Sequence, residues 1–109
     1  RPCLLLTTRG RKSGREYTHP LLYAQDGEDF VIVASKGGSD EQPHWYFNLL
    51  AEPTVRMQVG PDEFAARARA VDDTEYPRLW ALVTAMYPPY LDYQARTARR
   101  IPLFLLSRA

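Results

Sequence analysis

The sequence predicts an α+β fold that is mainly β, an antiparallel sheet of six strands with short flanking helices. Three observations lead to this prediction. The chain has 109 residues, which is the usual length of one domain. Segments rich in β-branched and aromatic residues recur along it, and turns with glycine or proline separate them. Stretches with helical spacing interrupt the strands, and six strands joined by hairpins can close into a small barrel.

The strands are expected at residues 3–8, 16–24, 29–35, 54–59, 63–71 and 101–107. Residues 9–15 form a turn with two glycines, and a second turn, 25–28, has Asp26-Gly27 at its centre. The helices are expected at 43–52, around 79–86 and at 90–99, and Pro88-Pro89 breaks or kinks the chain between the last two.

The charge balance argues against a general nucleic-acid binder. The chain has 14 Lys and Arg against 13 Asp and Glu, whereas such proteins usually carry a strong basic excess. The basic residues nevertheless gather in two places, within residues 9–15 and again as Arg96, Arg99 and Arg100. Local clusters in a balanced chain suggest a small anionic ligand as the partner.

The single cysteine, Cys3, excludes an intrachain disulfide and favours a cytoplasmic setting. Because it falls in the strand 3–8, we expect it to be buried and to serve packing rather than nucleophilic chemistry. No apolar run reaches the roughly 18 residues of a membrane span, and no signal peptide is visible. The chain begins at Arg1 without a methionine, so we expect further residues upstream, which could contact a membrane surface.

The first candidate site is the turn Arg9-Gly10-Arg11-Lys12-Ser13-Gly14-Arg15. A turn with glycines exposes backbone N–H groups, and cationic side chains beside them can bind phosphate or carboxylate. Arginine adds bidentate geometry and lysine a point charge. On spacing alone, a solvated basic hairpin tip explains the turn equally well. A Walker loop is excluded because the glycine spacing is wrong and no helix follows.

Two more candidates flank the first expected helix. In Ala34-Ser35-Lys36-Gly37-Gly38 the glycines permit close approach by a flat ligand, and Ser35 and Lys36 add a hydrogen-bonding group and a charge. An ordinary strand-to-helix connection is the alternative. In Pro43-His44-Trp45-Tyr46-Phe47-Asn48 the aromatic rings could line a ring-binding pocket, with Trp45 and Asn48 on one face. Core packing of Trp45 and Phe47 is the alternative that the residues by themselves favour.

The fourth candidate is the series Tyr87, Tyr90 and Tyr93. Spacing of three places the hydroxyls along one helical stripe, if the helix survives the two prolines. Such a row of phenols can bind or protonate a polar substrate. An amphipathic face with tyrosine tips in water is the commoner explanation.

Several kinds of site are missing from the sequence. His19 and His44 are the only histidines and Cys3 the only thiol, so the chain offers no zinc site. It also has neither a GxSxG motif nor a paired-carboxylate signature. An enzyme of this kind would depend on a borrowed organic cofactor.

Four segments, LLLTTRGRKSGREYTHPLLY, FVIVASKGG, PHWYFNLLAEPTVRMQVG and MYPPYLDYQARTARRIPLFLL, together resemble the deazaflavin-dependent nitroreductase family. Members are actinobacterial relatives of the flavin-binding split barrels. The four segments occur in the order that is typical of this family, and together they cover nearly the whole chain. The resemblance implies one domain over residues 1–109 with a split β-barrel fold, like that of FMN-binding split barrels, that binds coenzyme F-420.

The resemblance also implies site residues. The phosphate and acidic tail of the coenzyme would lie on Arg11, Lys12, Ser13, Gly14 and Arg15. The deazaflavin ring would lie by Ser35, Lys36, Gly37, Gly38, Pro43, Trp45 and Asn48. Tyr87, Tyr90 and Tyr93 would face the substrate. The implied reaction is hydride transfer to a small electrophilic acceptor (a nitroaromatic, quinone or enone), with Ser35 or a tyrosine hydroxyl polarising that acceptor.

Three other interpretations stay open at this point. The same fold could bind FMN, although four cations in one turn favour the longer coenzyme. It could be a non-catalytic deazaflavin carrier. An unrelated nucleic-acid binder fits least, because of the balanced charge. The expected partner is therefore a small molecule rather than nucleic acid, and split barrels of this kind often pair as homodimers.

Overall fold

The computed structural model describes residues 2–109, which form one antiparallel sheet with helices at its margins. The strands are β1 (Cys3–Arg9), β2 (Glu16–Leu22), β3 (Ala24–Asp26), β4 (Asp29–Val33), β5 (Thr54–Val59), β6 (Asp62–Ala70) and β7 (Leu103–Arg108). The helical elements are the 3₁₀ turn η1 (Lys36–Gly38) and the α-helices α1 (His44–Ala51), α2 (Tyr76–Met86) and α3 (Pro89–Ala95).

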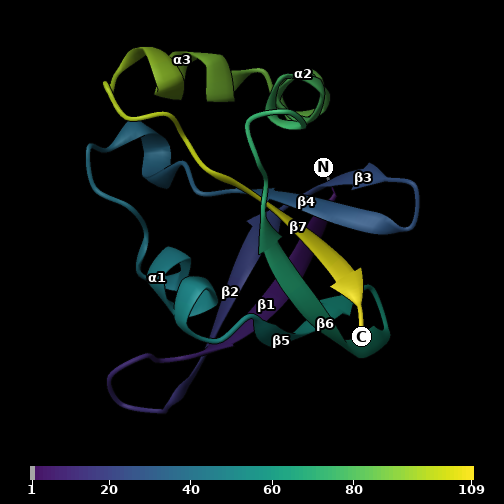
Figure 1. Cartoon of the computed structure of the whole chain (residues 1–109). Coiled ribbons are helices and arrows are strands. Elements are labelled where there is room, and N and C mark those ends of the chain that lie inside the picture. The colour runs from purple at the N-terminus through teal and green to yellow at the C-terminus, as the bar shows by residue number, and fades with distance from the viewer. Residues whose placement is uncertain (1) are drawn as a thin grey trace.

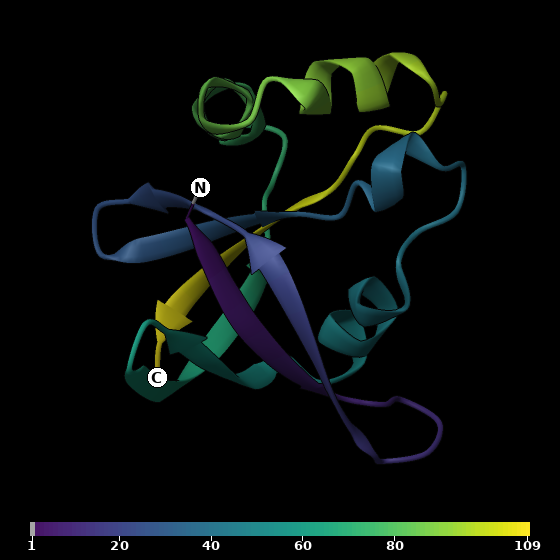
Figure 2. The same ribbon diagram turned by 180° about the vertical axis from the view of Figure 1, so that it is seen from behind.

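The strands lie in the order β2-β1-β5-β6-β7-β4-β3, so segments distant in sequence become neighbours. The sheet curls, and β2 at one end of this order comes back toward β4 near the other end. Figures 1 and 2 show that the turn between β1 and β2, η1 and α1 all lie on the same side of the curled sheet. At the top of both views α2 lies over β3 and β4, and α3 lies over η1.

The described residues contain seven strands, so the prediction of six was wrong. The expected strand 16–24 is divided at Tyr23, whose N–H donates to the Pro2 carbonyl oxygen at 3.2 Å instead of joining a ladder. On one side of this break β2 pairs with β1, and on the other β3 pairs with β4. The sheet turns a corner here, which the continuous pattern of the sequence does not reveal.

Other boundaries differ from expectation by one to four residues. Pairing of Asp26 with Asp29 puts Gly27-Glu28, rather than Asp26-Gly27, at the centre of that hairpin turn, and Gly27 has a φ of 62°. The last strand begins at Leu103 rather than at 101, because the Ile101 N–H bonds to the Gln94 side chain. The third helix ends at Ala95 rather than at 99.

Strands β4 and β7 are buried on both faces, and this explains their continuous apolar runs. One core fills the inside of the curl, where Phe104 and Leu106 pack with Trp45 of α1. The second core lies on the other face, where Val31 and Val33 pack under α2 and α3. Both faces of β4 are therefore fixed by packing, which holds the turn that follows it.

The expectation that Cys3 is buried was wrong, because its side chain is exposed. In β1 the buried residues are Leu4, Leu6 and Thr8, whereas Cys3 and Leu5 face outward. The apolar run in β1 hides this alternation of period two. Among residues 2–109, the helices are all too short to span a bilayer.

Candidate functional site

Two adjoining cavities on the α1 side of the sheet form a groove, and His19 and His44 line both of them. The first cavity, of about 440 Å³, is lined by Gly10, Arg11, Lys12, Ser13, Tyr17, His19, His44 and Asn48. The second, of about 420 Å³, is lined by His19, Pro20, Leu21, Leu22, Val33, Ser35, Lys36, Pro43, His44, Trp45 and Tyr90. The groove thus joins the basic turn to the turn after β4.

Local hydrogen bonds brace the basic turn. The Gly10 N–H donates to the Arg15 carbonyl oxygen at 2.7 Å, and the Gly14 N–H donates to the Gly10 carbonyl oxygen at 2.9 Å. Gly14 has a φ of 73°, which glycine adopts readily. The Ser13 hydroxyl accepts from the Arg15 N–H at 3.1 Å and bonds the Tyr17 hydroxyl at 3.3 Å. The turn is therefore a defined frame from which its side chains project.

Two of the four cations of the turn have partners within residues 2–109, and two do not. Arg9 donates to the Gly14 carbonyl oxygen at 3.5 Å. The Arg11 guanidinium donates to Asn48 at 3.0 Å and lies over the Phe47 ring, 5.0 Å from its centroid. Within residues 2–109, the side chains of Lys12 and Arg15 have neither a hydrogen bond nor an ion pair. These two exposed cations are the ones available to an anionic ligand.

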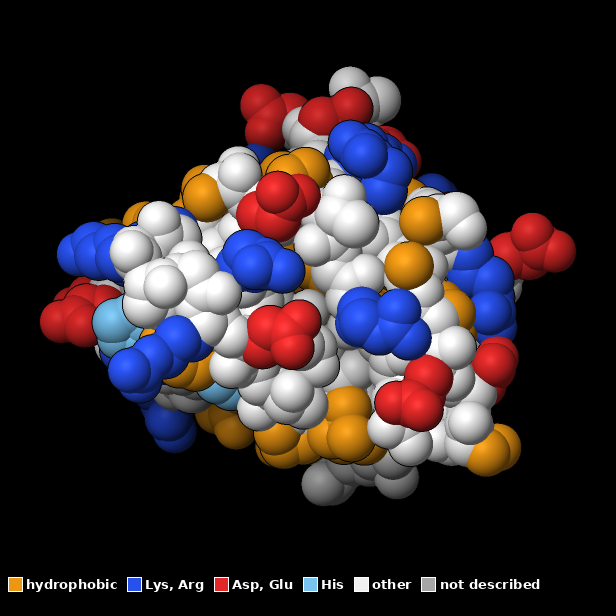
Figure 3. Space-filling view, turned by 90° about the horizontal axis from the view of Figure 1, so that it is seen from below, with side chains coloured by type: hydrophobic (Ala, Val, Ile, Leu, Met, Phe, Trp, Pro, Cys, Tyr) orange, Lys and Arg blue, Asp and Glu red, His pale blue; other side chains and the backbone are white. Residues whose placement is uncertain are grey.

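Charge on the neighbouring surface is mixed. The view in Figure 3 shows Lys and Arg interspersed with Asp and Glu over most of the face, and several basic side chains lie near histidine at its left edge, where an acidic side chain lies as well. That face offers no continuous basic track to a polyanion. A compact anionic ligand fits the left edge of this face better than a polyanion does.

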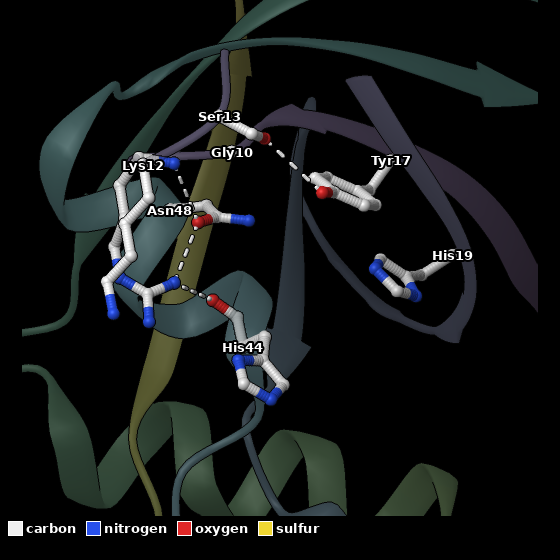
Figure 4. A pocket seen from close by; sticks show the side chains of 8 residues that line it. Gly10, Lys12, Ser13, Tyr17, His19, His44 and Asn48 are labelled. Carbon is white, nitrogen blue, oxygen red and sulfur yellow. Dashed lines mark hydrogen bonds between the residues drawn. The ribbon is translucent and has the colours of Figure 1, made fainter. Parts of the chain in front are cut away.

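Asn48 connects α1 to the basic turn (Figure 4). Its side-chain oxygen accepts from the Arg11 backbone N–H at 3.2 Å and from the Arg11 guanidinium at 3.0 Å. Its amide nitrogen donates to the Thr8 hydroxyl at 3.4 Å, and both Asn48 and Thr8 are buried. Trp45 lines the second cavity, whereas Asn48 lines the first. Asn48 therefore holds the turn in place, and the two residues that share a helix face serve different cavities.

The turn after β4 has an unusual backbone. Lys36, Gly37 and Gly38 have φ values of 45°, 63° and 85°. A Cβ on Gly38 would lie 2.7 Å from the carbonyl oxygen of Tyr93, so Gly38 allows the turn to pack against α3. Lys36 lines the second cavity, and its ammonium lies 3.4 Å from Glu41. Glycine is therefore required at position 38 by packing against Tyr93 and not by close approach of a ligand.

The three tyrosines form a cluster, although not along one helix. The chain breaks between α2 and α3, with Tyr87 at the end of α2 and Tyr90 and Tyr93 in α3. Their ring centroids are nevertheless 4.9–6.3 Å apart, and the Tyr87 and Tyr93 hydroxyls are 3.4 Å apart. Of the three, only Tyr90 lines the second cavity.

Burial first, and the neighbouring Tyr87 and Tyr93 in addition, together raise the pKa of Tyr90 to about 12. The hydroxyl of Tyr90 therefore stays protonated at neutral pH. It can donate a hydrogen bond or a proton into the second cavity, and it is a poor general base.

The three arginines of the second basic cluster all have partners within the chain, and an anionic ligand at this cluster stays a prediction. Arg96 lies over the Tyr93 ring, and Arg100 pairs with Asp73 at 2.7 Å and lies over the Tyr76 ring. Arg99 turns toward backbone carbonyl groups of the turn after β4. Three neighbouring cations thus point to three separate partners.

Several residues that line the groove received no site role from the sequence, among them Tyr17, His19 and His44. Figure 4 shows Tyr17 and His19 of β2 on one side of the first cavity and His44 and Asn48 of α1 on the other. The alternation in β2 could have revealed the first two, because residues two apart share a face. Of the two histidines, His19 was considered only as a metal ligand.

The groove has two chemically different ends. At one end Arg11 and Lys12 line the first cavity, and at the other Leu21, Trp45 and Tyr90 supply apolar and aromatic surface. Arg15 belongs to the same turn but does not line either cavity. A ligand with a flat ring and an anionic tail would match both ends at once.

Comparison with known proteins identifies the family that this chain resembles. The family model described as "F420H(2)-dependent quinone reductase" matches residues 1–108. An F420H(2)-dependent quinone reductase of Mycobacterium tuberculosis is 46% identical over 110 residues, which cover 98% of this chain and 74% of that protein. A solved F420-H2 dependent reductase has a TM-score of 0.90 at 41% identity, over 98% of this chain and 95% of the other.

Another solved structure, described as a domain-swapped dimer, also has a TM-score of 0.90 at 41% identity. The match covers 98% of this chain and 81% of that chain. These structures share the curled antiparallel sheet with few helices.

The role assigned to Asn48 can be tested by hydrogen exchange. Asn48→Ala removes the acceptor of the Arg11 backbone N–H, so that amide should exchange about five- to tenfold faster, as a lost hydrogen bond of about 1 kcal/mol implies. The Val71 amide, which donates to Leu103 in the sheet, serves as the internal reference. Asn48→Asp keeps the acceptor oxygen and should change the exchange rate less. Equal Arg11 exchange in wild type and Asn48→Ala would contradict the anchoring role.

Proposed function

The chain belongs to the F420H(2)-dependent quinone reductase family and is an oxidoreductase, and we propose that it carries hydride from reduced coenzyme F-420 to a quinone. The observation that supports this proposal is the groove itself. Its two cavities meet at His19 and His44, so a single elongated ligand can occupy both.

The residues of the groove fit this coenzyme. Its acidic tail would lie against Lys12 and Arg15, whose charges have no other partner within residues 2–109. Its flat ring would lie in the second cavity, between Leu21 of β2 and Trp45 of α1. His19 and His44 would then contact the middle of the coenzyme. The bound reduced coenzyme supplies the hydride.

The protein positions the reactants and excludes water. The apolar walls of the second cavity, which include Leu22 and Val33, remove water from the reacting faces. Ser35 and Tyr90 place hydroxyl groups at this cavity, where either can donate to an acceptor carbonyl. We assign to Tyr90 the role of donating a hydrogen bond to the acceptor oxygen, because it lines this cavity and its hydroxyl stays protonated. Tyr87 and Tyr93 would support it through the ring cluster.

Nitroaromatics and enones are further acceptors in this proposal, since both gain electron density on an oxygen that a hydroxyl can stabilise. The relatives are named for F-420, and the alternative of FMN has no support among them. We also propose homodimer formation, because a similar chain is described as a domain-swapped dimer. Peripheral contact with a membrane surface stays a proposal as well.

Removal of the two free cations should weaken coenzyme binding. We expect Lys12→Ala with Arg15→Ala to lower the affinity for oxidised F-420 about tenfold or more, because each charge-assisted contact contributes on the order of 1.5 kcal/mol. Titration followed by tryptophan fluorescence measures the affinity.

The matched control is Arg56→Ala with Arg67→Ala, which removes the same charge from exposed positions of β5 and β6 that do not line the groove. This control should bind F-420 nearly as wild type does. If both double variants lose affinity equally, net charge explains the effect and the assignment of the tail site is wrong.

Removal of the Tyr90 hydroxyl should affect turnover rather than binding. Tyr90→Phe is expected to lower kcat for a quinone about tenfold, as the loss of one hydrogen bond of about 1.4 kcal/mol in the transition state implies, and to leave F-420 affinity unchanged. Since the pKa of Tyr90 is about 12, the contribution of Tyr90 should stay constant from pH 6 to pH 9 and decline only as pH rises toward that pKa. Unchanged kcat on several quinones would remove Tyr90 from the chemistry.

A further inference from the structure

Arg99 lies in the segment after α3 and binds the turn after β4 with all parts of its guanidinium. Its Nε donates to the Ser39 carbonyl oxygen at 2.8 Å, its Nη1 to the Ala34 carbonyl oxygen at 3.1 Å and to Gln42 Oε1 at 2.9 Å, and its Nη2 to the Ser35 carbonyl oxygen at 2.8 Å. The planar fork of arginine matches several acceptors at once, which an ammonium cannot do.

The acceptors are neutral carbonyl and amide oxygens rather than carboxylates. Burial lowers the pKa of the Arg99 guanidinium, and the nearby Asp40 carboxylate acts in the opposite direction. Asp40 is itself bonded to the Thr97 hydroxyl at 2.7 Å. Among residues 2–109, Arg99 is in no ion pair, so its hydrogen-bonding geometry is what the turn uses.

The turn that Arg99 binds has a backbone that side chains rarely adopt. Lys36 has a φ of 45°, a left-handed conformation that is costly for a residue with a Cβ, and the next two residues are also left-handed. Arg99 binds the carbonyl groups of Ser35 and Ser39, which lie before and after this stretch. It therefore fixes both ends of the strained segment.

Helix α3 contacts both this turn and the segment that carries Arg99. Gly38 packs directly on the backbone of Tyr93. Gln94 of α3 donates to the Arg99 carbonyl oxygen at 2.7 Å and accepts from the Ile101 N–H at 2.9 Å. Arg99 is thus held by the helix whose Tyr90 lines the second cavity, while it holds the turn whose Ser35 lines the same cavity.

We propose that Arg99 is a positioning residue that sets Ser35 and Lys36 at a fixed place relative to Tyr90. In the proposed function, on which this inference rests, the turn contacts the ring of the coenzyme and Tyr90 contacts the acceptor. Arg99 touches neither, but it determines how the two meet. Its loss should therefore impair ring binding and hydride transfer while the sheet stays folded.

Hydrogen exchange tests the proposal without the coenzyme. The Gly38 N–H donates to the Ser35 carbonyl oxygen and the Ser39 N–H to the Lys36 carbonyl oxygen, so both amides report on the turn. In Arg99→Ala these amides should exchange about tenfold faster, whereas the Val71 amide of the sheet should not change. Arg100→Ala is the matched control, because the adjacent Arg100 contacts Asp73 and Tyr76 instead of the turn.

Kinetics with reduced F-420 and a quinone test the consequence. Arg99→Ala should lower kcat/KM about tenfold or more, and millimolar guanidinium should restore part of it, whereas ammonium should not. Arg99→Lys keeps the charge and should also fail to restore activity, because a single ammonium cannot reach four acceptors. Arg100→Ala should stay within about twofold of wild type.

The outcomes separate the two proposals. If wild type does not bind F-420, the proposed function fails, and the exchange experiment still decides the role of Arg99. Unchanged exchange at Gly38 and Ser39 in Arg99→Ala would overturn the positioning role. If Arg99→Ala does not fold, Arg99→Lys takes its place. The proposal would then be overturned if Arg99→Lys had the same exchange rates at Gly38 and Ser39 and the same activity as wild type.

Discussion

The groove depends on one buried amide, that of Asn48, which keeps α1 and the basic turn at a fixed spacing. The Asn48 side chain accepts two hydrogen bonds from Arg11 and donates one to Thr8 of β1. An unpaired amide at this depth would be costly, so all three partners are fixed together. With the turn in this place, Lys12 lines the first cavity, and His44 at the beginning of the same helix lines both cavities. Asn48 therefore acts on the ligand site through structure rather than by contact with the proposed ring.

The curl of the sheet supplies the rest of the site. The groove takes residues from β2, from the turn after β4, from α1 and from α3, and the strand order makes these distant segments neighbours. Burial of β4 on both faces gives the turn after it a firm base. Arg99 then ties this turn to α3, so the two sides of the second cavity do not move independently. The proposed hydride transfer requires this constancy, because it depends on the distance between two bound rings.

Much of this arrangement could be predicted from local patterns. Glycine, proline and alternating residues indicated most strands and all three α-helices to within a few residues. The break at Tyr23 escaped because it arises from the corner of the sheet, where a long-range bond to Pro2 replaces the ladder. The exposure of Cys3 escaped because an apolar run conceals which of its residues face inward. The partners of Asn48 and Arg99 lie 37 to 65 residues away, and pairing over such separations leaves no periodic signal.

The central claim is that one coenzyme occupies both cavities in one orientation. A crystal structure of the protein with oxidised F-420 bound tests this claim most directly. The account predicts the phosphate and acidic tail within hydrogen-bonding distance of Lys12 and Arg15, and the ring in the second cavity beside Ser35 and Trp45. A coenzyme bound in the reverse direction, or outside the groove, would contradict the account.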